Sequence, residues 1–190
     1  MNKELLTVEK QTKKERGFFW EAIRFALVAF LIVMPFRLWI AQPFIVRGAS
    51  MDPAFVDGEY LIIDELSYHL RAPERGEVVV FRYPLDPKTF FIKRVIGLPE
   101  ETVIIESGGV SIRDVDDAPV LLQESYLRTE TETMPDLRVK LGPEEYFVMG
   151  DNRSESLDSR RWGTLPRALI TGRTLVRLWP FTRIGFLQKS

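Results

Sequence analysis

The stretch Gly48-Ala49-Ser50-Met51-Asp52-Pro53 divides the chain into two parts with different patterns. Before it lies an apolar segment from Phe18 to Ile40, and after it the apolar residues recur in short runs typical of strands. The stretch itself reads as a polar turn that carries a serine. A nucleophile so close to a membrane-sized helix would suit a substrate that is held in the membrane.

The composition of the chain limits the classes to which it can belong. Its 190 residues are 45% apolar and 28% charged, which is typical of one globular domain with a short additional element. The net charge of −1 gives no general attraction for nucleic acid, and we expect no nucleic-acid partner. The absence of cysteine excludes thiol catalysis, Cys-ligated zinc and disulfides, and we expect neither a metal nor another cofactor.

The single histidine, His69, lies in a polar segment between two expected strands. A Ser-His-Asp triad or a multi-histidine metal site would have to use this residue. The surrounding residues favour an exposed loop histidine instead. If the chain is a serine hydrolase, its base is therefore another side chain.

Residues 18–40 are predicted to form a membrane anchor. The uncharged core from Phe25 to Phe36 is shorter than the roughly 20 residues that a span needs. However, the arginines that flank this core can reach the membrane surface with their long side chains, which extends the usable length. Trp20 and Trp39 bracket the run, as aromatic residues at membrane interfaces do.

A cleaved signal peptide is the alternative to an anchor. Cleavage after Ala41 would place Trp39 at a position that requires a small side chain, so the pattern favours an uncleaved anchor. The excess of basic residues in the tail over residues 1–17 predicts that this tail is cytoplasmic. Residues 41–190 would then form an extracytoplasmic domain, with the lipid bilayer as a partner of the protein.

We expect residues 41–190 to form mainly antiparallel β structure. Prolines and glycines separate short apolar runs, and Ser107-Gly108-Gly109 between two such runs predicts a hairpin turn. The polar stretch from Arg113 to Glu132 lacks the spacing of a calcium loop and is interpreted as a solvated loop. The predicted strands cover Tyr60–Ile63, Val78–Phe81, Phe90–Ile96, Val103–Ile105, Val110–Ile112, Tyr146–Met149 and Leu169–Leu178.

Lys93 stands out within the expected strand Thr89–Gly97. Alternation places Lys93 on one face of the strand and Arg94 on the other, so one of two adjacent cations must point toward apolar surface. Burial could lower the pKa of a lysine from about 10.4 to about 7–8, and a neutral amine could take the proton of the turn serine. An edge strand with both cations reaching water is the alternative, and spacing leaves both open.

The segment from Gly150 to Arg160 is a third cluster of polar residues. Its glycine, asparagine and aspartates predict a tight turn, and its acids and arginines predict local ion pairs. The pattern favours a polar corner, while a hydroxyl such as that of Ser156 could alternatively orient the lysine amine. Nucleophile-elbow, S-x-x-K, H-E-x-x-H, P-loop and dinucleotide-binding motifs are absent.

Taken together, these segments resemble the bacterial type I signal peptidases, which are membrane-anchored Ser/Lys endopeptidases. The resemblance extends over nearly the whole chain beyond the N-terminal tail, and the order of its motifs makes it specific. The segments that carry it are Phe36-Arg37, Gln42-Pro43-Phe44, Ser50-Met51-Asp52-Pro53, Arg75–Phe81, Lys93–Pro99, Gly150–Arg160, Trp162-Gly163 and Trp179-Pro180.

The resemblance implies an antiparallel β catalytic domain with a small accessory β subdomain over about residues 98–145, preceded by one transmembrane helix. It also implies that Ser50 is the nucleophile, that Lys93 is the general base and that Ser156 helps to orient the amine. The backbone N–H of Ser50 would stabilise the oxyanion. The substrates would be the signal peptides of exported preproteins, cut after A-x-A-like sites at the bacterial plasma membrane with no obligate protein partner.

Two further groups of residues follow from the resemblance. Side chains near the site would be structural, with an aspartate pairing the arginine next to the base: Arg94, Asp151, Asp158 and Arg160. Others would build pockets that admit alanine-like side chains and exclude larger ones: Val46, Met51, Phe55 and Ile92. Gly48 stands where many members carry a serine that assists the oxyanion, so the resemblance leaves a second oxyanion donor open.

Two rival functions remain at the level of sequence. A self-cleaving Ser/Lys repressor protease would carry an N-terminal DNA-binding domain, and the apolar segment occupies that place. A membrane-tethered β scaffold would bind peptides without chemistry. Cleavage of a preprotein separates the scaffold from the peptidase.

Overall fold

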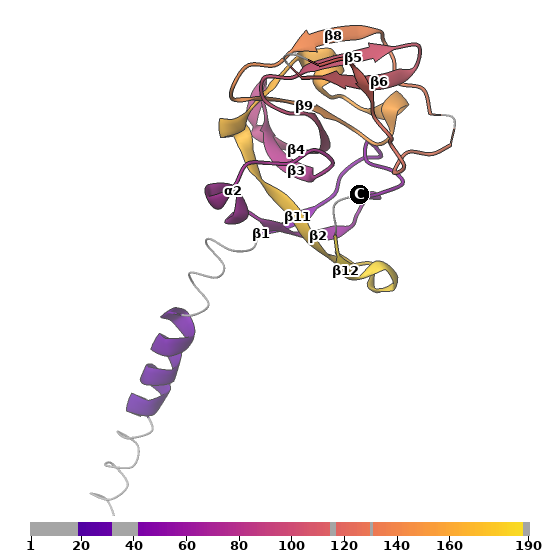
Figure 1. The fold of residues 1–190 in the computed structure, drawn as a ribbon. Coiled ribbons are helices and arrows are strands. Elements are labelled where there is room, and N and C mark those ends of the chain that lie inside the picture. The colour runs from indigo at the N-terminus through magenta and orange to yellow at the C-terminus, as the bar shows by residue number, and fades with distance from the viewer. Residues whose placement is uncertain (1–18, 32–41, 115–116, 130, 188–190) are drawn as a thin grey trace, which may run out of the picture. The chain divides into compact units, whose positions relative to one another are not determined.

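The β structure expected after residue 41 forms two antiparallel sheets (Figure 1). The structure is a computed structural model that describes residues 19–31, 42–114, 117–129 and 131–187. It contains two units, residues 1–40 and residues 41–190, which are taken separately.

The larger sheet has the strand order β1-β2-β11-β3-β4-β9-β10, and β12 pairs with β11. All its pairings are antiparallel. Its strands are β1 (Gln42–Ile45), β2 (Tyr60–Asp64), β3 (Val78–Tyr83), β4 (Asp86–Gly97), β9 (Glu145–Met149), β10 (Leu165–Pro166), β11 (Ile170–Trp179) and β12 (Gly185–Phe186).

The smaller sheet has the order β7-β6-β5-β8, also antiparallel. Its strands are β5 (Thr102–Glu106), β6 (Gly109–Arg113), β7 (Val120–Leu121) and β8 (Leu137–Lys140). Short helices connect the strands of both sheets: α2 (Ser67–Leu70), α3 (Ser159–Trp162), η1 (Arg153–Glu155), η2 (Arg167–Leu169) and η3 (Phe181–Arg183).

Each of the seven strand predictions corresponds to an observed strand, with ends that differ by a few residues. The hairpin between β5 and β6 turns through Ser107 and Gly108, which both have positive φ, as predicted. Five short strands were not predicted: β1, β7, β8, β10 and β12. At least half of the residues in β1 and β8 are exposed, and β7, β10 and β12 have two residues each, too few to give a pattern.

Two further sequence interpretations need correction. His69 lies in the one-turn helix α2 rather than in an irregular loop, although it is exposed as expected. The stretch from Arg113 to Glu132 is only partly a solvated loop, because it contains β7 and two anchoring side chains. Glu124 pairs with the buried Arg153, and the ring of Tyr126 lies 4.0 Å from the guanidinium of Arg94. Asp116 lies outside the described residues.

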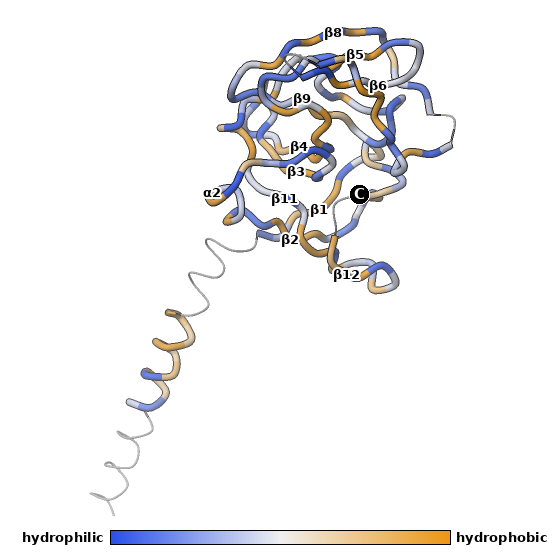
Figure 2. Tube along the Cα trace, viewed as in Figure 1, coloured by the Kyte–Doolittle hydropathy of each residue, from blue (hydrophilic) through white to orange (hydrophobic). Residues whose placement is uncertain are grey.

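The apolar runs of β3, β4 and β9 are explained by packing on both faces of the larger sheet. Val78 and Val80 of β3 pack in one cluster, while Val79 and Phe81 pack in another on the opposite face. A third cluster joins Phe147 of β9 to the smaller sheet. The hydropathy colouring in Figure 2 shows apolar stretches along β4 and β9.

The larger sheet curls so that its edge strand β1 approaches β4. Three strands, β2, β11 and β3, separate β1 from β4 along the sheet. Nevertheless, the rings of Phe44 in β1 and Phe90 in β4 lie 5.4 Å apart, edge to face. The strand β9 pairs with β4 only from Arg94 onward, so the earlier part of β4 has a free edge on the side away from β3. This curl leaves a cavity between β1 and β4.

Residues 19–31 of the N-terminal unit form a helix with most of its large apolar side chains exposed. The predicted anchor over 18–40 is described only in this range, and residues 18 and 32–40 lie outside the described residues. Among the helices that the structure describes, none reaches the length and apolar character required to cross a membrane.

Candidate active site

The turn that carries Ser50 is held by the backbone and by side chains from distant segments. Gly48 has a φ of +83°, a value that favours glycine, and its N–H donates to Oδ1 of Asp57 at 2.7 Å. Asn152 fixes the turn from the other side, because its backbone N–H donates to the Ser50 carbonyl at 3.1 Å and its Nδ2 to the Ala49 carbonyl at 3.2 Å. The Ser50 hydroxyl is therefore presented from a constrained backbone.

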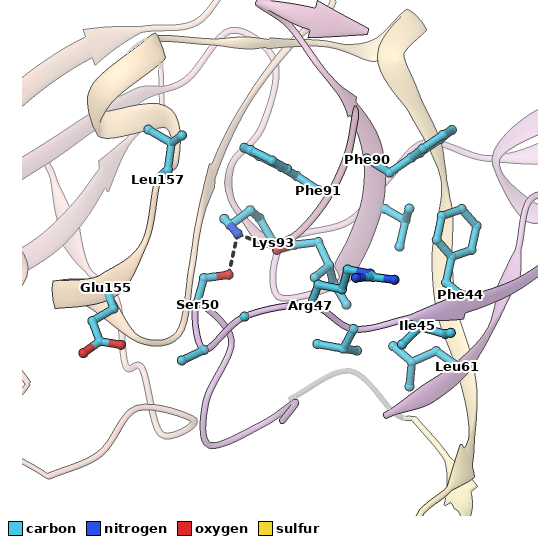
Figure 3. Close-up of a pocket in the computed structure, with 15 residues that line it drawn as sticks. Phe44, Ile45, Arg47, Ser50, Leu61, Phe90, Phe91, Lys93, Glu155 and Leu157 are labelled. Atoms are coloured by element: carbon cyan, nitrogen blue, oxygen red, sulfur yellow. Dashed lines mark hydrogen bonds between the residues drawn. The ribbon is translucent and has the colours of Figure 1, made fainter. Parts of the chain in front are cut away.

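Lys93 reaches the same point from β4. Its Nζ lies 2.7 Å from Oγ of Ser50 and donates to the carbonyl of Ile92 at 2.8 Å (Figure 3). The side chain is only 4% exposed, and its amine lies 5.3 Å from the ring of Phe91. The arrangement combines a hydroxyl and an amine at hydrogen-bond distance, away from water.

Burial lowers the pKa of Lys93 from 10.5 to about 8, because desolvation disfavours the charged amine. The negative charges of Asp158 and Asp151 oppose this effect but do not cancel it. In the described part of the chain no carboxylate forms a salt bridge with this amine. A substantial fraction of Lys93 is therefore neutral near pH 8 and able to accept a proton.

The neighbouring cation, Arg94, is also buried but fully paired. Its Nε and Nη2 donate to the two oxygens of Asp151 at 2.8 and 2.7 Å, and its Nη1 donates to the Gly76 carbonyl at 2.8 Å. Arg94 is 2% exposed, so both adjacent cations of β4 are buried and the alternative in which both reach water is wrong. Within the described residues, only the arginine has a carboxylate partner, and the lysine amine contacts a hydroxyl and a carbonyl.

Asp158 and Arg160 form a second buried pair beneath the site. Two nitrogens of Arg160 each lie 2.8 Å from an oxygen of Asp158, and the Gly150 N–H donates to Asp158 at 3.0 Å. Burial alone would raise the pKa of Asp158, but the hydrogen bonds and charge of Arg160 hold that pKa below its usual value. The pair fixes the segment that begins at Gly150.

Gly150 allows this segment to approach the nucleophile. A Cβ atom on Gly150 would lie 2.3 Å from the Ser50 carbonyl oxygen and 2.3 Å from Oγ of Ser156, distances at which no side chain fits. Ser156 is buried, and its hydroxyl helps to lower the pKa of Asp158. The hydrogen bonds of the Lys93 amine run to Ser50 and Ile92, so the orienting role of Ser156 stays a prediction.

A cavity of about 470 Å³ opens beside Ser50 and Lys93 (Figure 3). Of the residues expected to bind substrate, Val46, Gly48 and Ile92 line it, while Met51 and Phe55 lie in the apolar cluster that contains Val46. The remaining lining residues were not predicted: Phe44, Ile45, Arg47, Ala49, Leu61, Val80, Phe90, Phe91, Glu155 and Leu157. Alternation along the strands could have indicated Phe44 from Val46 and Phe90 from Ile92.

His69 does not line this cavity. His69 lines a separate cavity of about 330 Å³ with Tyr68 and Arg167. Within the described ranges, no group of three or more histidine, aspartate or glutamate side chains is placed to hold a metal ion.

Comparison with known proteins identifies the family. The model of the signal peptidase family, peptidase S26, matches residues 19–179. The chain belongs to this family. It is 36% identical over 189 residues to the probable signal peptidase I-2 of Synechocystis sp., with 95% of this chain and 83% of that protein covered. It is 30% identical to signal peptidase I of Bacillus licheniformis, with 94% of this chain and 98% of that protein covered.

A crystal structure of a signal peptidase I from Enterococcus faecalis V583 also matches, with 28% identity and a TM-score of 0.46. The match covers 54% of this chain and 97% of that one. The family and its relatives make this chain a peptidase of the signal peptidase I type, as the resemblance of its motifs implied.

The buried pair of this signal peptidase predicts a large loss of stability in Asp151→Ala. The variant leaves the Arg94 charge buried without its partner, and the free energy of unfolding should fall by about 3–5 kcal/mol. Urea unfolding of the full chain in detergent measures this change. The double variant Arg94→Met/Asp151→Leu removes both charges and should recover most of the loss. A loss below about 1 kcal/mol in Asp151→Ala would contradict the assignment.

The lowered pKa of Lys93 predicts that Lys93→Met stabilises the signal peptidase at pH 7. The difference between 10.5 and about 8 corresponds to about 3 kcal/mol against the folded state. This penalty is complete below the folded pKa and disappears as the pH rises above 10.5, so the gain in Tm should be present at pH 7 and shrink at pH 10.5. Two lost hydrogen bonds reduce the net gain to about 1–3 kcal/mol.

The matched control for this measurement is Lys88→Met, which removes an exposed lysine of the same strand. Its effect on Tm should be small and should not change between pH 7 and pH 10.5. A lower Tm for Lys93→Met than for the unaltered protein at pH 7 would contradict the burial argument.

Proposed function

We propose that this chain is a membrane-anchored serine endopeptidase that removes signal peptides from exported preproteins through a Ser50/Lys93 dyad. The single observation that carries the proposal is the 2.7 Å hydrogen bond between the Lys93 amine and the Ser50 hydroxyl, with the pKa of the amine lowered to about 8. Membership of the family supports the reaction class. The cut follows an A-x-A-like site, and no metal or cofactor takes part.

The mechanism begins with neutral Lys93, which takes the proton of Ser50 as Oγ attacks the scissile carbonyl carbon. The backbone N–H of Ser50 has no acceptor among the described residues, so it is available to the oxyanion. The protonated amine then donates its proton to the departing nitrogen, and the acyl group stays on Ser50. Lys93 next activates a water that hydrolyses this ester and frees the serine.

The residues around the dyad hold it in position. Gly150 leaves room for both the Ser50 carbonyl and the buried hydroxyl of Ser156, and in this proposal that hydroxyl orients the amine. Asp151 and the Asp158–Arg160 pair fix the segment that contains Ser156. Gly48 offers no hydroxyl to the oxyanion, and its own N–H is already bound to Asp57.

The substrate binds as an extended strand between β1 and β4. Both strands have a free edge that faces the cavity, so a peptide can add backbone hydrogen bonds to them. Val46, Ile92 and Leu61 line the apolar part beside Ser50, with Met51 and Phe55 packed around Val46. Side chains larger than alanine would meet this packed wall, which explains the preference for small residues by exclusion.

Two substitutions test the dyad directly. In a preprotein cleavage assay, Ser50→Ala and Lys93→Met should each lower kcat/KM by at least about 1,000-fold, because the nucleophile or its base is lost. For the unaltered enzyme, kcat/KM should rise with pH and level off above about pH 8, where the amine of Lys93 is neutral. Lys88→Met should keep normal turnover. Near-normal cleavage by Ser50→Ala or by Lys93→Met would refute the mechanism.

We further propose that the protein lies at the bacterial plasma membrane with residues 1–17 in the cytoplasm and 18–40 as anchor. Residues 41–190 are then extracytoplasmic, with the smaller sheet as an accessory subdomain over about residues 98–145. The exposed apolar side chains of the helix over 19–31 support an apolar surrounding for that segment. Lipid and signal peptide are the expected partners.

An aromatic patch on the catalytic unit supports contact with the bilayer surface. It consists of exposed side chains from β2, β11, η3 and β12: Tyr60, Trp179, Phe181, Ile184 and Phe186. Trp179 lies opposite Tyr60 in the sheet and 4.8 Å from the ring of Phe181. Tryptophan and tyrosine favour the membrane interface, and such a cluster is unusual on a surface that contacts only water.

The cysteine-free chain allows a clean test of this contact. A polarity-sensitive fluorophore on Phe186→Cys should shift to shorter wavelength when the full chain is reconstituted into lipid vesicles, because the label enters an apolar layer. The matched control is Leu121→Cys, which replaces an exposed apolar residue on the smaller sheet. An unshifted spectrum at position 186, or an equal shift at both positions, would exclude the patch as the lipid contact.

A further inference from the structure

The cavity beside Ser50 has an unpaired charge at each end. Arg47 follows β1 and lies with Phe44 on one side of Ser50, while Glu155 of η1 lies with Leu157 on the other side (Figure 3). Both charged residues are exposed at the cavity. Neither forms a salt bridge with another residue in the described ranges. A bound peptide would therefore meet opposite charges on the two sides of its scissile bond.

The arginines closest to Glu155 in the sequence bind other carboxylates. Arg153 pairs with Glu124, and Arg160 pairs with Asp158. The backbone of Glu155 is fixed by Asn152, since the Glu155 N–H donates to the Asn152 carbonyl at 3.2 Å. The backbone N–H of Asn152 also donates to the carbonyl of Ser50. The carboxylate of Glu155 therefore belongs to the same segment that positions Ser50.

The direction of the substrate decides which part of it meets Glu155. This step rests on the proposed function, in which the small residues before the cut occupy the apolar part of the cavity near Val46 and Ile92. The chain that departs with the new amino terminus must then leave on the opposite side of Ser50. Glu155 and Leu157 are the cavity residues on that side (Figure 3).

We propose that Glu155 is a specificity-determining residue for the positions that follow the cut. Its carboxylate favours preproteins with a basic residue in the first two positions of the released chain and disfavours those with an acidic one. The effect is electrostatic and acts at an exposed site, so it is modest and decreases with salt. Charge complementarity of this kind changes the choice among substrates more than the chemistry itself.

The test uses three preprotein substrates that differ only in the second residue after the cut, which is Lys, Gln or Glu. The measured quantity is the ratio of kcat/KM for the Lys substrate to that for the Glu substrate, with the cut position checked by mass spectrometry. The unaltered enzyme should prefer the Lys substrate by about fivefold at low salt. Glu155→Gln should bring the ratio close to one, and Glu155→Lys should invert it.

Two control variants separate this effect from a change in net charge. Glu144→Gln removes an exposed carboxylate outside this cavity and should leave the ratio unchanged. Arg47→Gln removes the charge at the other end of the cavity and should also leave this ratio unchanged. A preference that Glu155→Gln abolishes, with both controls unchanged, supports the proposal.

The possible failures are distinguishable. If the unaltered enzyme cuts none of the three substrates, the proposed function fails and the inference fails with it. If all three are cut but the ratio is the same in the unaltered enzyme and in Glu155→Gln, only the inference is overturned. If Arg47→Gln changes the ratio and Glu155→Gln does not, the peptide lies in the opposite direction and the assignment to Glu155 is wrong.

Discussion

The desolvation of one amine is the constraint on which the structure around Ser50 depends. In water the Lys93 ammonium would hold its proton too tightly to act as a base near neutral pH. Placing the side chain at 4% exposure, without a salt bridge to any described carboxylate, lowers its pKa to about 8. The Ser50 hydroxyl lies 2.7 Å from this amine, so in the proposed dyad its proton is within reach of the neutral amine.

The two adjacent buried cations of β4 have different partners: Arg94 pairs with a carboxylate, and Lys93 contacts uncharged groups. The side chain of Arg94 enters a site that already contains a carboxylate, a carbonyl and the ring of Tyr126, and its charge is retained. Lys93 points to the opposite face of the strand, where the acceptors are an uncharged hydroxyl and an uncharged carbonyl. The contacts of Arg94 with Asp151 and the Gly76 carbonyl hold the strand in place. The position of the adjacent Lys93 along the strand is thereby fixed. One strand therefore contains both the paired arginine and the amine that contacts Ser50.

Local patterns predict the strands well, but they do not predict how the sheet closes. The runs from Val78 to Phe81 and from Tyr146 to Met149 are recognisable because packing on both faces demands continuous apolar residues. The cavity depends on the approach of β1 to β4, which is a contact between residues far apart in the sheet. Alternation could have placed Phe44 on the face of Val46 and Phe90 on the face of Ile92, but no short-range pattern predicts that the two rings lie side by side. The anchoring roles of Glu124 and Tyr126 were hidden for the same reason, since a polar stretch resembles a solvated loop until its partners are known.

The interactions that hold Ser50 are long-range and polar, and this explains why a low-pKa lysine can persist in a stable domain. Burial of Lys93 acts against folding at neutral pH. Two carboxylates of the segment from Gly150 to Arg160 reduce that cost, because the charges of Asp158 and Asp151 favour the ammonium form of Lys93. The same segment leaves Gly150 no room for a side chain, because the Ser50 carbonyl and the Ser156 hydroxyl both lie where a Cβ would be. The segment that contacts the Ser50 turn therefore also supplies the charges that act on Lys93.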